Sequence, residues 1–215
     1  MAGGRPLVEG ARGRFITFEG IDGAGKSTHV AWVTEAIAAR GHRVVATREP
    51  GGTPVGETLR DLLLSVPMTH DSEALLMFAA RREHLERVIR PALSRGEWVL
   101  CDRFTDATYA YQGGGHGVPV EHIAALERFV HGDLQPDVTL LFDVPLEVSR
   151  ARLAKAQANG RTLDKFENEK EAFFARVRDA YLARASAAPQ RFRIVDSSRP
   201  VDEVRAELAR MVAQW

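Results

Sequence analysis

The sequence has a single cysteine and no excess of charge of either sign. Because Cys101 is alone among 215 residues, no disulfide bond can form within the chain, and we expect a reducing compartment, the cytoplasm. Cys101 ends an apolar run, so we interpret it as a buried hydrophobic side chain and not as a nucleophile. Lys and Arg together number 29, and so do Asp and Glu. This balance argues against a protein that binds nucleic acid or an anionic membrane.

Long apolar runs are also missing. No stretch approaches the ~20 consecutive apolar residues of a membrane-spanning helix, so we expect no membrane partner. Residues 1–13 lack the apolar segment of a signal peptide, and we expect them to form a disordered tail. The whole chain is 45% apolar and 27% charged, as is usual for a globular protein. Its length favours a single domain over residues 14–215.

One local pattern indicates a specific chemistry. An apolar run at residues 15–18 leads into G-x-x-x-x-G-K-S at residues 20–27, and a helical pattern follows with Val30, Val33 and Ile37 on one side. Glycines let backbone N–H groups approach a polyphosphate, and the helix N-terminus adds partial positive charge. A chance match in a glycine-rich turn would not need this strand and helix around it. The pattern therefore predicts a nucleoside triphosphate site formed by Gly20, Ile21, Asp22, Gly23, Ala24, Gly25, Lys26, Ser27 and Thr28.

Apolar runs and helical patterns alternate along the whole chain. This alternation predicts an α/β fold with a five-stranded parallel sheet covered by helices on both faces. We expect Pro91 to kink one long helix, and Gly113, Gly114 and Gly115 to break another. The expected strands are residues 15–18, 43–47, 97–101, 138–143 and 191–196. The expected helices are residues 28–39, 56–65, 72–90, 107–112, 120–131, 145–156, 167–185 and 201–215.

Polar clusters follow four of the expected strands. They are the loop at residues 20–27, REPGG at residues 48–52, the pair Asp102 and Arg103, and Asp143. Ligands of such sheets bind beyond the carboxyl ends of the strands. We therefore expect these clusters to form one site.

Several motifs occur in order after the phosphate-binding loop. They are TREPGGT at residues 47–53, FAARREH at 78–84, DRFTDATYAYQG at 102–113 and LDKFE at 163–167. Together they resemble the bacterial type of thymidylate kinase, from about Phe15 to Trp215. The resemblance implies a P-loop NTPase-like fold with a mobile lid. It also implies transfer of the γ-phosphoryl group of ATP to dTMP, with Mg²⁺ as cofactor, in a homodimer.

The resemblance assigns the residues that handle phosphate. Lys26 and Arg103 are expected to be catalytic, and Arg60 joins Arg103 in holding the monophosphate of dTMP, because guanidinium groups suit a phosphate dianion. Ser27 and Asp102 would hold Mg²⁺. The remaining acidic residue, Asp22 within the loop, would accept a hydrogen bond from the 3′-hydroxyl of the sugar.

It also assigns the residues that bind the nucleoside. Arg81, Thr108 and Gln112 would recognise thymine, since its edge offers two carbonyl acceptors and one N–H donor. Tyr111 would crowd the ribose 2′ position. Other members often stack a Phe on the base four residues before the arginine, where this chain has Met77 and, next to it, Phe78. We assign Phe78 to the substrate site, with Met77 as the open alternative. Glu49 and Pro50 would line the sugar and the phosphate.

Departures from the family pattern direct attention to a basic segment. Ala107 stands where many members have Ser, and Lys165 where Arg is common, so bidentate geometry is lost there. Gly23 stands where eukaryotic members carry a loop arginine. We expect that missing charge from a lid at about residues 150–164, with Arg152 and Arg161 as catalytic residues. The alternative is a solvated basic helix face.

Two other functions fit part of the pattern. A kinase for a different nucleoside monophosphate would share the fold and the phosphate chemistry. A nucleotide-dependent switch would share only the loop. The sequence lacks the guanine-reading N-K-x-D motif, and a switch would have no use for the cluster formed by Arg60, Arg81, Arg103 and Gln112.

Overall fold

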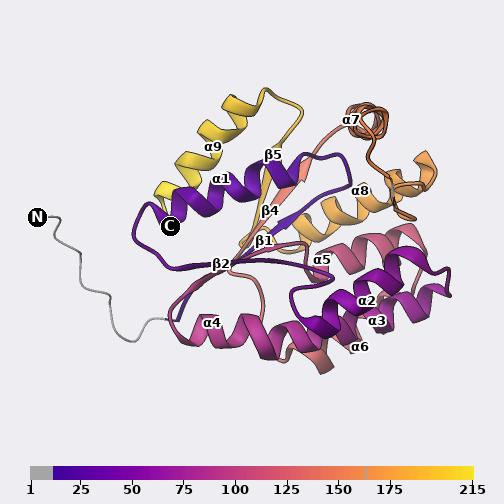
Figure 1. Cartoon of the computed structure of the whole chain (residues 1–215), viewed down its shortest axis with the longest axis horizontal. Coiled ribbons are helices and arrows are strands. Elements are labelled where there is room, and N and C mark those ends of the chain that lie inside the picture. The colour runs from indigo at the N-terminus through magenta and orange to yellow at the C-terminus, as the bar shows by residue number, and fades with distance from the viewer. Residues whose placement is uncertain (1–11, 163) are drawn as a thin grey trace, which may run out of the picture.

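The computed structural model describes residues 12–162 and 164–215. Their centre is an all-parallel sheet in the order β2-β3-β1-β4-β5, which confirms the predicted α/β fold (Figure 1). The strands are β1 (Phe15–Glu19), β2 (Val44–Arg48), β3 (Trp98–Asp102), β4 (Val138–Asp143) and β5 (Phe192–Asp196).

Helices pack against both faces of this sheet. In Figure 1, α1 and α9 lie together on one side of the strands, while α4, α3 and α8 lie on the other. The helices are α1 (Lys26–Ala38), α2 (Pro54–Ser65), α3 (His70–His84), α4 (Arg90–Ser94), α5 (Thr105–Thr108), α6 (Val120–His131), α7 (Leu146–Ala158), α8 (Glu171–Ala187) and α9 (Val201–Ala213), with π-helical segments η1 (Leu85–Ile89) and η2 (Tyr109–Gly115). None of these described helices has the length and apolar character needed to cross a membrane.

The buried core forms two clusters, which divide the residues of β3 because successive strand residues face opposite sides of the sheet. In β3, Trp98 and Leu100 belong to the cluster that includes the α1 and α9 side chains, whereas Val99 and Cys101 pack with residues of α3, η1 and α4. Cys101 is fully buried, as predicted, and burial raises the pKa of its thiol.

Three local predictions differ from the structure. The glycines at residues 113–115 do not break the helix but continue it as η2. A Cβ at Gly115 would lie 2.4 Å from the ring of Phe173 in α8. These glycines therefore allow close helix packing. The helix expected at residues 72–90 is divided into α3 and the π-helical segment η1, and the chain continues through Pro91 as α4. The helix expected from residue 167 begins at Glu171. The preceding residues form a turn, in which Asp164 Oδ1 accepts from the N–H groups of Phe166 and Glu167.

Most of the expected tail lies outside the described residues, which begin at Arg12. Arg12 and Gly13, which that prediction included, contact the rest of the fold. The Gly13 N–H donates to the carbonyl of Leu93, and the Arg12 guanidinium pairs with Asp137. Leu163, within the expected lid, also lies outside the described residues.

Candidate active site

A cleft of about 410 Å³ lies beyond the carboxyl ends of the strands. It brings together segments that are far apart in the sequence: the loops after β1, β2 and β3, parts of α2, α3, α5, η2 and α7, and the described residues Arg161, Asp164, Phe166 and Glu167. Most of the predicted site residues line it, namely Asp22, Gly23, Gly25, Lys26, Ser27, Thr28, Glu49, Pro50, Arg60, Arg81, Asp102, Arg103, Thr108, Tyr111, Gln112, Arg152 and Arg161.

The phosphate-loop end of the cleft is made by residues 20–28 and Arg103. Gly23 and Gly25 take positive φ angles of 75° and 86°, and a Cβ at Gly23 would lie 2.6 Å from the carbonyl oxygen of Ser149. The helix α1 starts directly at Lys26, so its free N–H groups face this loop. Such an arrangement suits an anion.

Lys26 is drawn inward at this end. Its Nζ donates to the carbonyl oxygens of Gly20 at 2.9 Å and Ile21 at 3.2 Å. Burial, with the nearby Arg103 cation, lowers its pKa to about 8. Three predicted loop residues, Gly20, Ile21 and Ala24, are not among the described residues that line the cleft. The Ile21 and Ala24 side chains are instead buried in the core, where they support the loop from below.

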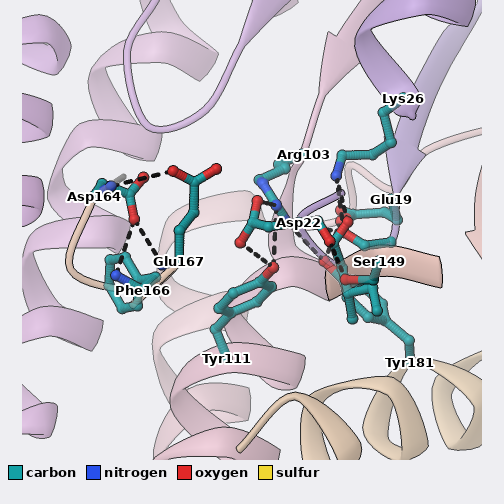
Figure 2. A network of polar contacts seen from close by, with 12 residues as sticks. Glu19, Asp22, Lys26, Arg103, Tyr111, Ser149, Asp164, Phe166, Glu167 and Tyr181 are labelled. Carbon is teal, nitrogen blue, oxygen red and sulfur yellow. Dashed lines mark hydrogen bonds and ion pairs between the residues drawn. The ribbon is translucent and has the colours of Figure 1, made fainter. Parts of the chain in front are cut away.

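Arg103, Asp22 and Tyr111 form a hydrogen-bonded triangle (Figure 2). Arg103 Nη2 donates to Asp22 Oδ1 at 2.5 Å and to the Tyr111 hydroxyl at 3.1 Å, and Tyr111 donates to Asp22 Oδ2 at 2.7 Å. Burial alone would raise the pKa of Asp22, but the charges of Arg103 and Lys26 hold it below its usual value. The carboxylate is therefore ionised and fixed in direction.

Glu19 supports this triangle from the end of β1, and the sequence analysis missed it. Arg103 has a φ of 65°, a left-handed conformation unusual for a side chain other than glycine. Glu19 Oε1 accepts from the N–H of the next residue, Phe104, at 2.7 Å. Its Oε2 accepts from Tyr181, whose hydroxyl in turn accepts from Arg103 (Figure 2). An acidic residue at the end of an apolar strand was the signal. Burial, with the Asp106 carboxylate, raises the pKa of Glu19 to about 8.

The α3 end of the cleft is made by Arg81 and its buried partners. Arg81 Nε donates to Glu49 Oε2 at 2.7 Å, and Nη2 donates to Thr108 Oγ1 at 3.0 Å. Nη1 is buried and has no hydrogen-bond partner among the described residues. His84 bridges Glu49 and Thr47, at 2.9 and 2.7 Å. Gln112 lies one helical turn beyond Thr108, so the Thr108 hydroxyl and the Gln112 amide both face this end of the cleft.

The structure corrects the assignment of Phe78 to the substrate site. Met77 lines the cleft, whereas Phe78 points into the core and is 1% exposed. The Arg81 guanidinium lies over the Phe78 ring at 4.7 Å, so Phe78 supports the arginine from beneath. In a helix, neighbouring residues differ in direction by about 100°, and a one-residue shift in register decides which side chain faces the cleft.

The two predicted lid arginines have different surroundings. Arg152 donates to the carbonyl oxygens of Gly23 and Ala24 at 3.3 Å and to that of Ser197 at 2.8 Å, so it rests on the phosphate-binding loop. Arg161 lies at the cleft rim and pairs with Glu167 at 2.5 Å. Arg60, in α2, also lines the cleft and donates to the carbonyl of Pro50 at 3.0 Å.

The donor set suits a hard divalent cation. Ser27 and Asp102 line the same part of the molecule, and Asp102 Oδ1 is buried with no hydrogen-bond partner in the described chain. A buried carboxylate oxygen without a donor leaves a site for a cation, and oxygen ligands are those that Mg²⁺ prefers.

Several lining residues were not assigned to the site from the sequence. Most lie within a motif, which gave the segment but not the direction of each side chain. They are Arg48, Leu64, Phe104, Ala107, Leu153, Asp164, Phe166 and Glu167.

Comparison with known proteins identifies closely similar sequences and structures. The family model described as thymidylate kinase matches residues 18–208. A thymidylate kinase of Bordetella petrii is 67% identical over 92% of this chain and 94% of its own length, and one of Cupriavidus metallidurans is 62% identical over 94% and 98%. The crystal structure of thymidylate kinase from Ehrlichia chaffeensis superposes with a TM-score of 0.74, at 34% identity, over 94% of this chain and 99% of that one.

Proposed function

The chain belongs to the thymidylate kinase family, and on this basis we propose that its cleft transfers the γ-phosphoryl group of ATP to dTMP, giving dTDP and ADP. The observation that carries the proposal is the composition of the cleft. One cavity joins a phosphate-binding loop to the Asp22–Arg103–Tyr111 triangle and, further along, to Arg81 and Gln112. A donor site, an acceptor phosphate site and a base site would thus share one space.

Phosphoryl transfer asks the protein for positioning and for neutralisation of charge. At the phosphate-loop end, Lys26 and the N-terminus of α1 would bind the outer phosphates of ATP. Arg60 and Arg103 would hold the phosphate of dTMP between them. Ser27 and Asp102 would hold Mg²⁺, which when bound neutralises phosphate charge.

The acceptor nucleoside would be held by groups that are already oriented. Asp22, fixed by Arg103 and Tyr111, would accept from the sugar 3′-hydroxyl. At the α3 end, the unpartnered Nη1 of Arg81 would donate to a thymine carbonyl, and the Gln112 amide would meet the N3–H group. Met77 would lie against the base.

The test is ADP release with ATP and Mg²⁺, measured with dTMP, dUMP, dCMP, dGMP and AMP as acceptors. We expect fast turnover with dTMP and weak turnover with dUMP. Preference for another monophosphate would keep the phosphate chemistry and overturn the acceptor assignment. Turnover independent of any acceptor would favour the nucleotide-dependent switch.

A lid at about residues 150–164 would close over ATP, and its arginines would contribute to the transition state. Arg152 already contacts the phosphate-binding loop, whereas Arg161 is held by Glu167. We therefore expect Arg152→Ala to lower kcat more than Arg161→Ala. If neither variant lowers kcat by more than a few-fold, the lid assignment fails for both residues.

A homodimer would cover apolar side chains on three neighbouring helices. Phe129 in α6 is 81% exposed, and α2, α3 and α6 lie side by side (Figure 1). Light scattering at micromolar protein should give twice the monomer mass, and Phe129→Glu should lower it. A monomer mass for the wild type would remove the proposal. The other large apolar residues exposed on α2, its C-cap, α3 and α6 are Val55, Leu62, Val66, Leu75 and Val120.

A further inference from the structure

A buried carboxylate behind the α3 end joins three separate segments. Glu73 of α3 is 3% exposed. Its Oε1 accepts from Lys165 Nζ at 2.7 Å, and its Oε2 lies 3.1 Å from His116 Nδ1 and 3.4 Å from Gln112 Nε2. Lys165 belongs to the segment after α7, and the other two donors belong to η2 and its C-cap. Of these four residues, Gln112 alone lines the cleft as described.

Glu73 is ionised at neutral pH. Burial would raise the pKa of this carboxyl group, but the hydrogen bonds from His116 and Lys165 hold it below its usual value. An ionised carboxylate only accepts hydrogen bonds. The side chain of Gln112 can therefore turn only its NH₂ group toward Glu73, which leaves Oε1 as the amide atom that faces away from Glu73.

We propose that Glu73 is a positioning residue that selects thymine over cytosine by fixing the orientation of the Gln112 amide. This inference rests on the proposed function. Thymine offers an N3–H donor and an O4 acceptor, which match Gln112 Oε1 and Arg81 Nη1. Cytosine offers the reverse, an N3 acceptor and a 4-amino donor, so both contacts become repulsive. A Gln112 amide turned by 180° would present its NH₂ group to N3, and the contact that disfavours cytosine at N3 would be lost.

The selection needs such a partner because a glutamine amide is nearly symmetric in shape. Its two orientations occupy the same space and differ only in which atom donates. The Arg81 guanidinium has no such freedom, since it carries donors only. Lys165 offsets the charge of Glu73, and its Nζ lies over the Phe166 ring at 5.0 Å. Phe166 lines the cleft together with Asp164 and Glu167, and the three lie side by side in Figure 2.

The decisive variant is Glu73→Gln, which keeps the size of the side chain but can both donate and accept. We expect the ratio of kcat/KM for dTMP to that for dCMP to fall about tenfold, the value of one misplaced hydrogen bond. The change should come mainly from KM. The ratio of dTMP to dUMP should stay constant, because uracil presents the same N3–H and O4 groups. A purely structural defect would not separate these two ratios.

Three further variants complete the test. Glu73→Asp keeps an acceptor-only group and should keep the preference for dTMP over dCMP. In a Gln112→Ala background, Glu73→Gln should leave the ratio unchanged, since no amide remains to be oriented. Asp106→Asn is the matched control: Asp106 is equally buried and paired with Arg184 and Arg191, so its loss should lower stability and leave the ratio unchanged.

The outcomes separate this inference from the proposed function. A folded Glu73→Gln enzyme with the wild-type dTMP-to-dCMP ratio overturns the inference alone, as does an equal change in the dTMP-to-dUMP ratio. A wild-type enzyme that does not turn over dTMP overturns the proposed function. If Glu73→Gln unfolds in the assay or dCMP turnover is too slow, dissociation constants for dTMP and dCMP measured in the cold give the same ratio.

Discussion

At the phosphate-loop end of the cleft, Arg103 and Asp22 leave 18% and 19% of their side chains exposed, whereas at the α3 end Arg81 and Glu49 leave 2% and 3%. The first pair lies where water or phosphate can solvate it. The charges of the second pair are shielded from water and are stabilised only by each other and by neighbouring protein groups. A substitution at the phosphate-loop end should therefore affect catalysis more than folding, and one at the α3 end should affect both.

The largest effect is expected for Lys26→Met. Loss of one preorganised cation at the transferring phosphate should lower kcat/KM by about 10³-fold. Stability should not fall, because burial already disfavours the ammonium group and lowers the pKa of Lys26 to about 8. Coupled assays and thermal unfolding measure the two quantities. Lys170→Met, at an exposed position, is the control and should change neither.

The next effect compares one carboxylate from each end. Glu49→Gln should lower the free energy of unfolding by ~3 kcal/mol, since it leaves the buried Arg81 guanidinium without its ionic partner. Asp22→Asn should lower it by no more than ~1 kcal/mol, because Arg103 remains accessible to water. Urea denaturation of both variants measures the difference. Equal losses would show that exposure does not separate the two ends.

A third prediction concerns pH, through Glu19 behind the phosphate-loop end. Burial raises the pKa of Glu19 to about 8, so between its unfolded value of 4.5 and about 8 the folded state keeps a proton that the unfolded state loses. The contribution of Glu19 to stability is therefore complete below about pH 4.5 and is lost as the pH rises through about 8. Glu19→Gln lacks this group. Its stability relative to wild type should increase by roughly 2 kcal/mol between pH 5.5 and 7 in urea titrations. A difference that is constant with pH would show that Glu19 is ionised throughout.

The same comparison explains how much the sequence could predict. Most of the phosphate-loop end follows from a contiguous motif whose backbone forms the loop, although Gly20, Ile21 and Ala24 of that motif do not line the cleft. The sheet was predictable for a similar reason, because each strand is a local apolar run. Arg103 was predicted as well, since it directly follows a strand.

The α3 end depends on contacts between distant segments. Glu49, Arg81 and Thr108 were each predicted from motifs, but their hydrogen bonds to one another follow from packing. Glu73 has no motif of its own, and Phe78 fits the family pattern in one helix register and the core in another. Sequence periodicity fixes a helical face only to within about one residue, whereas a ligand site requires the exact residue.

The smallest effect tests that register directly. Met77→Ala should raise KM for dTMP by about three- to tenfold, because a half-buried thioether lining the cleft is lost, while the midpoint of thermal unfolding changes little. Phe78→Leu should do the opposite: it removes core packing beneath Arg81 and lowers the free energy of unfolding by ~1 kcal/mol, with KM nearly unchanged. Both variants are compared in dTMP titrations and thermal melts. A raised KM for Phe78→Leu together with a wild-type KM for Met77→Ala would return the base contact to Phe78, and the α3 end would then place an aromatic ring, not a thioether, against its ligand.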